Sequence, residues 1–360
     1  MSAHGRADVI HEEPLGVVRG LLALIGAAFI RVLIRVCGRT LAASSTPWLS
    51  GPIGGDYIGD RPYEEVAARE NLQLVRRVSI GGLLPDVGAL AGPGFDVAGL
   101  RSEVRHFYEH TAAYRMDVWS KTFFPGNIGL WLLVTTISRK VNQLNFPLHA
   151  LATAKGLDSE IVLLLDRTGI VRYAGWYRRL VETGRTIYTG FYMTARVPRC
   201  DNPCVKVVFP MPDGNATVIL RPSIDAHGHL RLSSKGAAFG DAGFYRVQAI
   251  GDGRLRVWRV STLLEDFRVY VDGANVLRCD HSVSFLGMPI LHLHYRIERM
   301  SSDIDDAGAL ATLHALADLG ECQIIGMPRL LTENVAPVYS SGLSFRDLAL
   351  SASSRTSAAI

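Results

Sequence analysis

The chain has 360 residues, 48% of them hydrophobic and 20% charged, with a formal net charge of +4. This composition excludes global disorder and is sufficient for one large domain or two ordinary ones, each with its own core. The arginines are scattered rather than gathered into one stripe, so we expect no nucleic-acid partner. The five cysteines are too few to indicate a disulfide scaffold, and we interpret them as reduced thiols in a cytoplasmic protein.

An apolar stretch near the N-terminus, Gly20 to Ile30, is too short to span a bilayer, which takes about 20 residues. It continues into Arg31, Arg35 and Arg39, whose spacing of four places them on one side of a helix expected from Leu15 to Leu41. Such a basic amphipathic helix can lie on an anionic membrane surface. An ordinary core helix with its arginines in water shows the same pattern. We predict membrane contact through the three arginines, at the inner face of the membrane, with the core helix as the alternative.

Residues 1–158 have the pattern of a helical region with loops. A second helix is expected from Glu64 to Leu74, and a third from Leu100 to Trp119, where apolar residues recur at spacings of three and four. A further apolar stretch, Ile128 to Ile137, is again too short to span a membrane. We therefore treat residues 1–158 as one unit preceding the strands.

Residues 159–300 form a run of short alternating strands separated by turn signals. The turns are rich in Gly, Asn and Asp and lie at Asp166–Gly169, Met211–Asn215, Asp225–Gly228, Gly251–Gly253 and Asp272–Asn275. Connections this short join antiparallel neighbours, so we predict a meander of roughly nine to eleven strands. One open sheet of that width would leave two long exposed edges, and closing it into a barrel or folding it into a sandwich shortens them.

The predicted fold class is therefore α+β: a helical region, an antiparallel barrel or sandwich, and a short C-terminal helix. That last helix is expected from Ile304 to Leu319, within residues 301–360, which end in a mobile tail. In strand number and connectivity the meander resembles the lipocalin (calycin) architecture. The resemblance covers no motif, because Gly175-Trp176 lies inside a strand without the surroundings of the lipocalin signature. It implies an interior with room for a small ligand.

Apolar and polar residues alternate along the strands, which separates a core-facing side from a solvent-facing side. In Phe267–Asp272 and Leu277–Phe285 the odd-numbered residues form the apolar set, and the odd residues of Ile187–Ala195 are likewise expected to face inward. This places His281 on an apolar face. A desolvated imidazole can act as a base or anchor a ligand, and a core histidine paired with a hydroxyl or carbonyl is the structural alternative.

Aromatic and basic residues gather on two consecutive predicted strands. They are Trp176, Arg178, Tyr188, Phe191 and Tyr192. An aromatic wall with a few arginines suits a ligand with an acidic head and an apolar tail. Cross-strand aromatic pairing for stability alone explains the same residues. We predict that these five side chains and His281 contact the ligand.

The sequence does not specify a metal site or a cofactor, and we expect neither. Cys200 and Cys204 are spaced to bridge or to share a metal, but no histidine or second cysteine pair lies nearby, and we interpret them as part of a plain loop. His292 and His294 share one strand face, which we expect to point outward because Arg296 lies on it too.

No nucleophile elbow, phosphate-binding glycine loop or paired-carboxylate motif is present. Our leading hypothesis is a non-catalytic binding or carrier protein for an apolar or amphiphilic small molecule, associated peripherally with a membrane. The alternative is an enzyme acting on a hydrophobic substrate in the interior. In it His281 is the general base and a tyrosine such as Tyr295 or Tyr188 donates a hydrogen bond.

Overall fold

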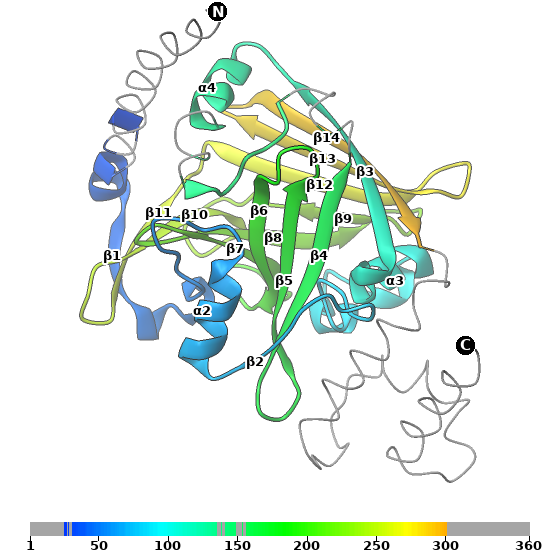
Figure 1. Cartoon of the computed structure of the whole chain (residues 1–360), viewed down its shortest axis with the longest axis horizontal. Coiled ribbons are helices and arrows are strands. Elements are labelled where there is room, and N and C mark those ends of the chain that lie inside the picture. Colours follow the sequence, from blue (N-terminus) through cyan, green and yellow to red (C-terminus); the bar gives the residue numbers. More distant parts are fainter. Residues whose placement is uncertain are drawn as a thin grey trace, which may run out of the picture.

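The computed structural model describes residues 25–26, 28, 31–134, 138, 141–148, 153 and 156–300. Within these residues fourteen strands form one antiparallel sheet, accompanied by the helices α2, α3 and α4, a helical segment at residues 31–37 and five 3-10 turns (Figure 1). The predicted C-terminal helix and tail, residues 301–360, lie outside the described residues, as does most of Gly20 to Ile30. In the part of the chain that is described, no helix has the length and apolar character to cross a bilayer.

The strands are β1 (Arg39–Ala42), β2 (Gln73–Val75), β3 (Tyr114–Thr122), β4 (Leu157–Leu165), β5 (Val171–Leu180), β6 (Thr186–Ala195), β7 (Cys204–Met211), β8 (Gly214–Ile224), β9 (Leu230–Ser233), β10 (Gly243–Ala249), β11 (Arg254–Arg259), β12 (Leu263–Val271), β13 (Leu277–Phe285) and β14 (Met288–Arg299). The α-helices are α2 (Arg61–Glu70), α3 (Ser102–Glu109) and α4 (Gly126–Leu133). The 3-10 turns are η1 (Ala43–Ser45), η2 (Pro47–Leu49), η3 (Val87–Leu90), η4 (Val97–Gly99) and η5 (Thr111–Ala113).

The sheet folds into two layers at β8. Its order is β2-β4-β5-β6-β7-β8-β9-β12-β13-β14-β3, so the predicted pairing of chain neighbours is confirmed for most strands. Along one edge of β8, Gly214–Ile219 pair with β10, whereas Arg221–Ile224 pair with β9. The β10–β11 hairpin thus leaves the main path, and β9 pairs with β12 instead. In Figure 1, β4 to β6, in green, run across β12 to β14, in yellow and orange.

The predicted closure into a barrel is wrong. The strands at the two ends of the order, β2 and β3, do not pair with each other, and the sheet is not closed. Instead of a neighbouring strand, the free edge of β3 meets side chains and loops: the Thr153 hydroxyl donates to the Val118 carbonyl at 2.7 Å. The architecture is an open, folded antiparallel sheet, and the likeness to lipocalins is not confirmed.

The described part of residues 1–158 is less helical than predicted, because β1, β2 and β3 lie there and join the sheet. The expected third helix stops at Glu109. The hydroxyl of Thr111 donates to the Phe107 carbonyl at 2.7 Å, and His110 leaves the helical backbone. The strand that follows alternates strictly, with Met116 and Val118 buried and their neighbours exposed. The apolar spacing we took for a helix therefore belongs to a helix and then a strand.

The basic N-terminal helix also ends earlier than predicted. Residues 31–37 are helical, but Arg39 begins β1 and pairs with Val257 of β11. Gly38 lies between the two elements, as glycine commonly does at the end of a helix. Arg31, Arg35 and Arg39 therefore do not share one helix face, because the last of them belongs to a strand.

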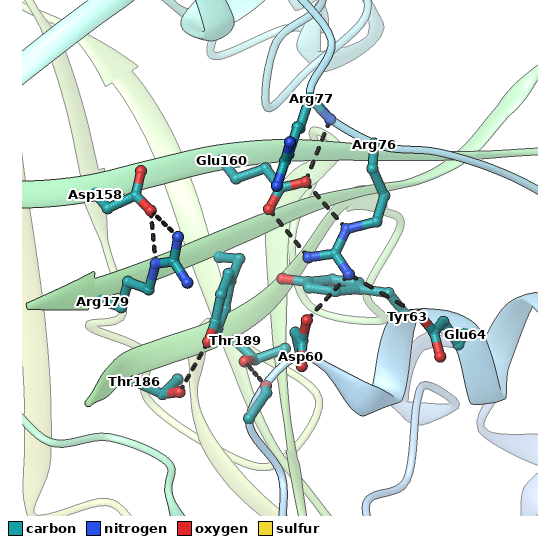
Figure 2. Close-up of polar contacts among 12 residues, drawn as sticks. Asp60, Tyr63, Glu64, Arg76, Arg77, Asp158, Glu160, Arg179, Thr186 and Thr189 are labelled. Carbon is teal, nitrogen blue, oxygen red and sulfur yellow. Dashed lines mark hydrogen bonds and ion pairs between the residues drawn. The ribbon is translucent and has the colours of Figure 1, made fainter. Parts of the chain in front are cut away.

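The helix α2 covers the outer face of β4 to β6 and is held there by packing and ion pairs. Gly175 lets the Tyr63 ring approach closely, since a Cβ on it would lie 2.4 Å from that ring. Arg76 donates to both carboxylate oxygens of Glu160 at 3.0 Å and to Asp60 at 3.0 Å (Figure 2). Both faces of β5 and β6 are consequently buried.

Because both faces of β6 are buried, the prediction that its odd-numbered residues face inward is wrong for Phe191. Phe191 points outward beneath α2, with its ring 4.9 Å from that of Tyr63, and is fully buried there. The even-numbered residues of β6, Tyr188 and Tyr192, face the space between the layers instead. Alternation of hydrophobicity could not separate these faces, because β6 is apolar on both. On β12 and β13 the odd-numbered residues do face inward, as predicted.

Replacing Phe191 with alanine should lower the free energy of unfolding by about 3–5 kcal/mol, because a large side chain packed under α2 is lost. Urea denaturation measures this change. The matched control is Phe285→Ala, whose side chain is 41% exposed and should change stability by less than about 1 kcal/mol. Equal effects of the two substitutions would contradict the placement of Phe191 in the core.

Candidate functional site

A cavity of about 210 Å³ lies between the two layers. Strands β5 to β10 and β12 to β14, Met116 near the start of β3, and the helices α3 and α4 contribute to its wall. Most of the wall is apolar, with side chains such as Phe107, Met116, Leu232, Phe244 and Ile290. A concave, mostly apolar space with a few polar groups is the usual form of a small-molecule site.

Most residues that we predicted to bind a ligand line this cavity. They are Trp176 and Arg178 of β5, Tyr188 and Tyr192 of β6, His281 of β13 and, from the enzyme hypothesis, Tyr295 of β14. Residues two apart on a strand share a face, and neighbouring antiparallel strands align those faces, so the fold gathers them. Phe191 is the exception, because it lies on the opposite face of β6.

Arg178 is the most unusual residue of the cavity. The residue is only 2% exposed. Its Nε and Nη2 atoms have no hydrogen-bond partner among the described residues. Its Cζ atom lies over three aromatic rings, 5.0 Å from the centre of Trp176, 5.3 Å from Tyr295 and 5.8 Å from Tyr188. The hydroxyls of Tyr188 and Tyr295 also hydrogen-bond to the guanidinium. Neither these neutral hydroxyls nor the ring faces carry a negative charge, so the buried charge is incompletely satisfied.

The tyrosines around Arg178 do not supply a negative charge. Burial raises the pKa of Tyr188, Tyr192 and Tyr295, so their hydroxyls stay protonated at neutral pH. Neutral hydroxyls can donate to a ligand but cannot neutralise a guanidinium. The tyrosines therefore leave the positive charge of Arg178 unbalanced.

Glu265, the carboxylate in the cavity wall, is paired with His281. The Nε2 atom of His281 lies 3.2 Å from Oε2 of Glu265, and both side chains are largely buried. Opposite His281 in the β12–β13 register, the Phe267 ring stacks on the imidazole at 3.8 Å. The pair and the stacked ring together fix the orientation of the imidazole.

Sequence reasoning missed Glu265, although a signal for it existed. Glu265 is two residues before Phe267 and four before Val269, so alternation along β12 places all three on the inner face. Tyr295, by contrast, is opposite Cys279 in the β13–β14 register and lies beside Arg178. The structure joins His281 with Glu265 rather than with a tyrosine.

The histidines expected on the outer face lie there. His294 is 2.7 Å from Oδ1 of Asp280, and His292 is 3.6 Å from the same oxygen. Across the residues that the structure describes, no group of three or more metal-ligating side chains is arranged to hold a metal ion. The expectations of no metal and no cofactor stay predictions.

The expected membrane contact also stays a prediction. Arg31 and Arg35 are exposed on the helical residues 31–37, next to the exposed side chains of Val32 and Val36. The guanidinium of Arg39 lies instead over the Phe239 ring, with Cζ 5.1 Å from its centre. Only the first two arginines therefore remain candidates for a common contact surface.

A second, larger space of about 630 Å³ is an open cleft on the outer face of the β5–β7 layer. It contains Lys206, whose ammonium group donates to the Ser50 carbonyl and whose pKa is lowered by burial to about 8. Tyr192 borders both this cleft and the inner cavity. The inner cavity is the stronger candidate site, because it is more enclosed and its cation has unused donors.

Comparison with known protein families, with curated proteins and with solved structures finds no match to this chain. A function must therefore be argued from the geometry of the site.

Replacing Arg178 with methionine should raise the free energy of unfolding of ligand-free protein by about 1–3 kcal/mol, because a buried, unpaired charge is removed. Chemical denaturation of protein stripped of small molecules measures this. The matched control is Arg76→Met, which breaks the ion pair with Glu160 and should lower stability by about 1–3 kcal/mol. Destabilisation of the Arg178 variant comparable with that of the control would show that its guanidinium is satisfied in the free protein.

Proposed function

We propose that this protein binds a small amphiphilic monocarboxylate between its two layers. The carboxylate lies on the guanidinium of Arg178, and the apolar tail lies against the aromatic and aliphatic wall of the cavity. The observation that carries the proposal is the buried Arg178 side chain with two unused donors, which faces a mostly apolar space. A charge in such a place is costly unless a partner completes its hydrogen bonds.

The unused atoms indicate the shape of that partner. Nε and Nη2 are the two donors on one edge of a guanidinium, and that edge matches the two oxygens of a carboxylate. Arg76 uses the same two atoms to hold Glu160, with both distances at 3.0 Å (Figure 2). One guanidinium balances one negative charge, which favours a monoanion over a doubly charged phosphate.

The size of the cavity limits the ligand. Its volume of about 210 Å³ is below the roughly 300–1,000 Å³ of sites for drug-sized ligands. A medium-chain carboxylic acid suits this space better than a lipid with two acyl chains. The hydroxyls of Tyr188 and Tyr295, beside the guanidinium, are available as further neutral donors to the carboxylate.

The proposal is tested by extraction and then by titration. Mass spectrometry of an organic extract of the purified protein should reveal a monocarboxylic acid. Calorimetric titration of stripped protein with decanoate should show binding that Arg178→Met weakens by roughly 30-fold or more, since truncating one side of a buried charge pair costs about 2–5 kcal/mol.

Decanol is the matched control ligand, because it has the same tail without the charge. Its affinity should be nearly equal for wild type and Arg178→Met. A variant that loses decanol and decanoate equally, or a wild-type protein that binds neither, would rule the proposal out.

The Glu265–His281 pair supports a second candidate function, an enzyme in which His281 removes a proton from a molecule held by Arg178. The pair is within hydrogen-bond reach and lines the same cavity as the guanidinium. Glu265 would orient the imidazole and stabilise its charged form after the transfer. Here Arg178 positions the substrate, and the tyrosines beside it supply hydrogen bonds.

Proton removal from carbon is detected by exchange with solvent. If the protein is an enzyme of this kind, the extracted ligand incubated with it in D₂O should gain deuterium, measured as a mass increase. His281→Gln should abolish the exchange and leave ligand affinity nearly unchanged. Ligand that stays unlabelled with wild-type protein would favour the carrier function alone.

A further inference from the structure

Two cysteines outside the cavity come together at the start of β7. Cys204 points away from the cavity into a second core, which also contains Trp48 and Tyr245, and it is fully buried. Cys200 packs at the border of the same core and is partly exposed. The side chains of Cys200 and Cys204 form a hydrogen bond with each other, and both cysteines are free thiols. The Cys204 thiol also points to the Asn202 carbonyl, at 3.8 Å.

The surroundings hold the two sulfurs in place. The turn between them is anchored by Asn202, whose Oδ1 atom accepts from the Gly94 amide at 3.2 Å. The Arg199 amide just before the turn donates to the Gly240 carbonyl at 2.8 Å. Because the backbone is fixed on both sides of the turn, the contact between the sulfurs is a built feature of the fold.

Arg221 and Asp241 lie beside the Cys200 sulfur. The Nη2 atom of Arg221 lies 3.5 Å from this sulfur and also contacts Asp241 at 2.5 Å. The Cys200 thiol donates to Oδ1 of Asp241 at 3.4 Å, and the amides of Ala237 and Ala242 donate to the same carboxylate. Asp241 thus holds the guanidinium of Arg221 against the sulfur, where its positive charge favours the thiolate.

We infer that Cys200 and Cys204 form a redox-active dithiol that a hydroperoxide converts into a disulfide. The thiolate of Cys200 attacks the outer oxygen of the hydroperoxide, and the O–O bond breaks. An alcohol, or water from hydrogen peroxide, leaves with one proton, and Cys200 becomes a sulfenic acid. Cys204 then attacks this sulfur, the S–O bond breaks, and its proton leaves with the hydroxide as water. The dithiol loses two electrons and the peroxide gains them.

The two cysteines have different roles because their surroundings differ. The hydrogen bond with Cys204 lowers the pKa of Cys200, and Arg221 adds to this against the opposing effect of burial. The same contact and burial raise the pKa of Cys204, which keeps its proton. The exposed sulfur is thus the nucleophile and the buried sulfur resolves the intermediate, an arrangement common in oxidant-sensitive cysteine pairs.

The full-length protein allows a direct test. Trypsin cleaves after Arg199 and Lys206, so one peptide, residues 200–206, carries both cysteines. Treatment with hydrogen peroxide near one equivalent, followed by N-ethylmaleimide, should yield this peptide 2 Da lighter and unalkylated. Exposed Cys37 is the internal control and should oxidise at least about tenfold more slowly. A 200–206 peptide still carrying two maleimides once Cys37 is oxidised would overturn the inference.

Variants separate the two steps. Cys204→Ser should leave a sulfenic acid on Cys200 that dimedone traps, and Cys200→Ser should leave buried Cys204 unmodified. Because the serine at 204 lies in the second core, Arg221→Gln provides an independent check away from it. This variant should slow disulfide formation at pH 7 by about tenfold, since the thiolate loses its cationic neighbour. An unchanged rate in Arg221→Gln, or equal dimedone labelling at both positions, contradicts the assigned roles.

Discussion

The structure depends on the division of β8 between two partners along one edge. Its first half pairs with β10 and its second half with β9. The sheet therefore folds at this strand into two layers that face each other. Without this change of partner, β5 and β6 would not lie opposite β12 to β14. The cavity, the position of Arg178 in it and the Glu265–His281 pair all follow from that fold.

Arg76 and Arg178 differ in how completely their charges are paired. Arg76 binds the carboxylate of Glu160 through its Nε and Nη2 atoms. The same two atoms of Arg178 have no hydrogen-bond partner among the described residues, and its guanidinium lies over aromatic rings. Leaving a buried charge incompletely paired costs stability, and proteins commonly accept such a cost at binding sites. The contrast within one chain makes the cavity, rather than the surface around α2, the place where a ligand is expected.

The strands from β4 to β14 were predictable from sequence because turn chemistry and alternation act locally, whereas β1, β2 and β3 were not predicted. His281 was correctly placed on the inner face, since β13 has one dry and one wet side. Phe191 was misplaced because α2 buries the outer side of β6 as well, and two apolar faces carry no alternating signal. The predictions of the length of the third helix and of the closure of the sheet were wrong for a related reason. Both features are decided by pairing with strands distant in the sequence and not by local pattern.

The pairing of His281 with Glu265 and the isolation of Arg178 depend on distances across the fold that no sequence pattern fixes. Sequence alone placed Arg178 and His281 among the ligand-contacting residues, but it did not include Glu265 and could not say which charges would neutralise each other.

The unclosed seam of the sheet leaves main-chain groups of β3 without a strand partner. In a closed barrel a continuous ladder of main-chain hydrogen bonds would satisfy them, whereas here the Val118 carbonyl accepts from the Thr153 hydroxyl at 2.7 Å. At this position a side-chain hydroxyl takes the place of a neighbouring strand, one of the ways in which proteins cover the edges of open sheets.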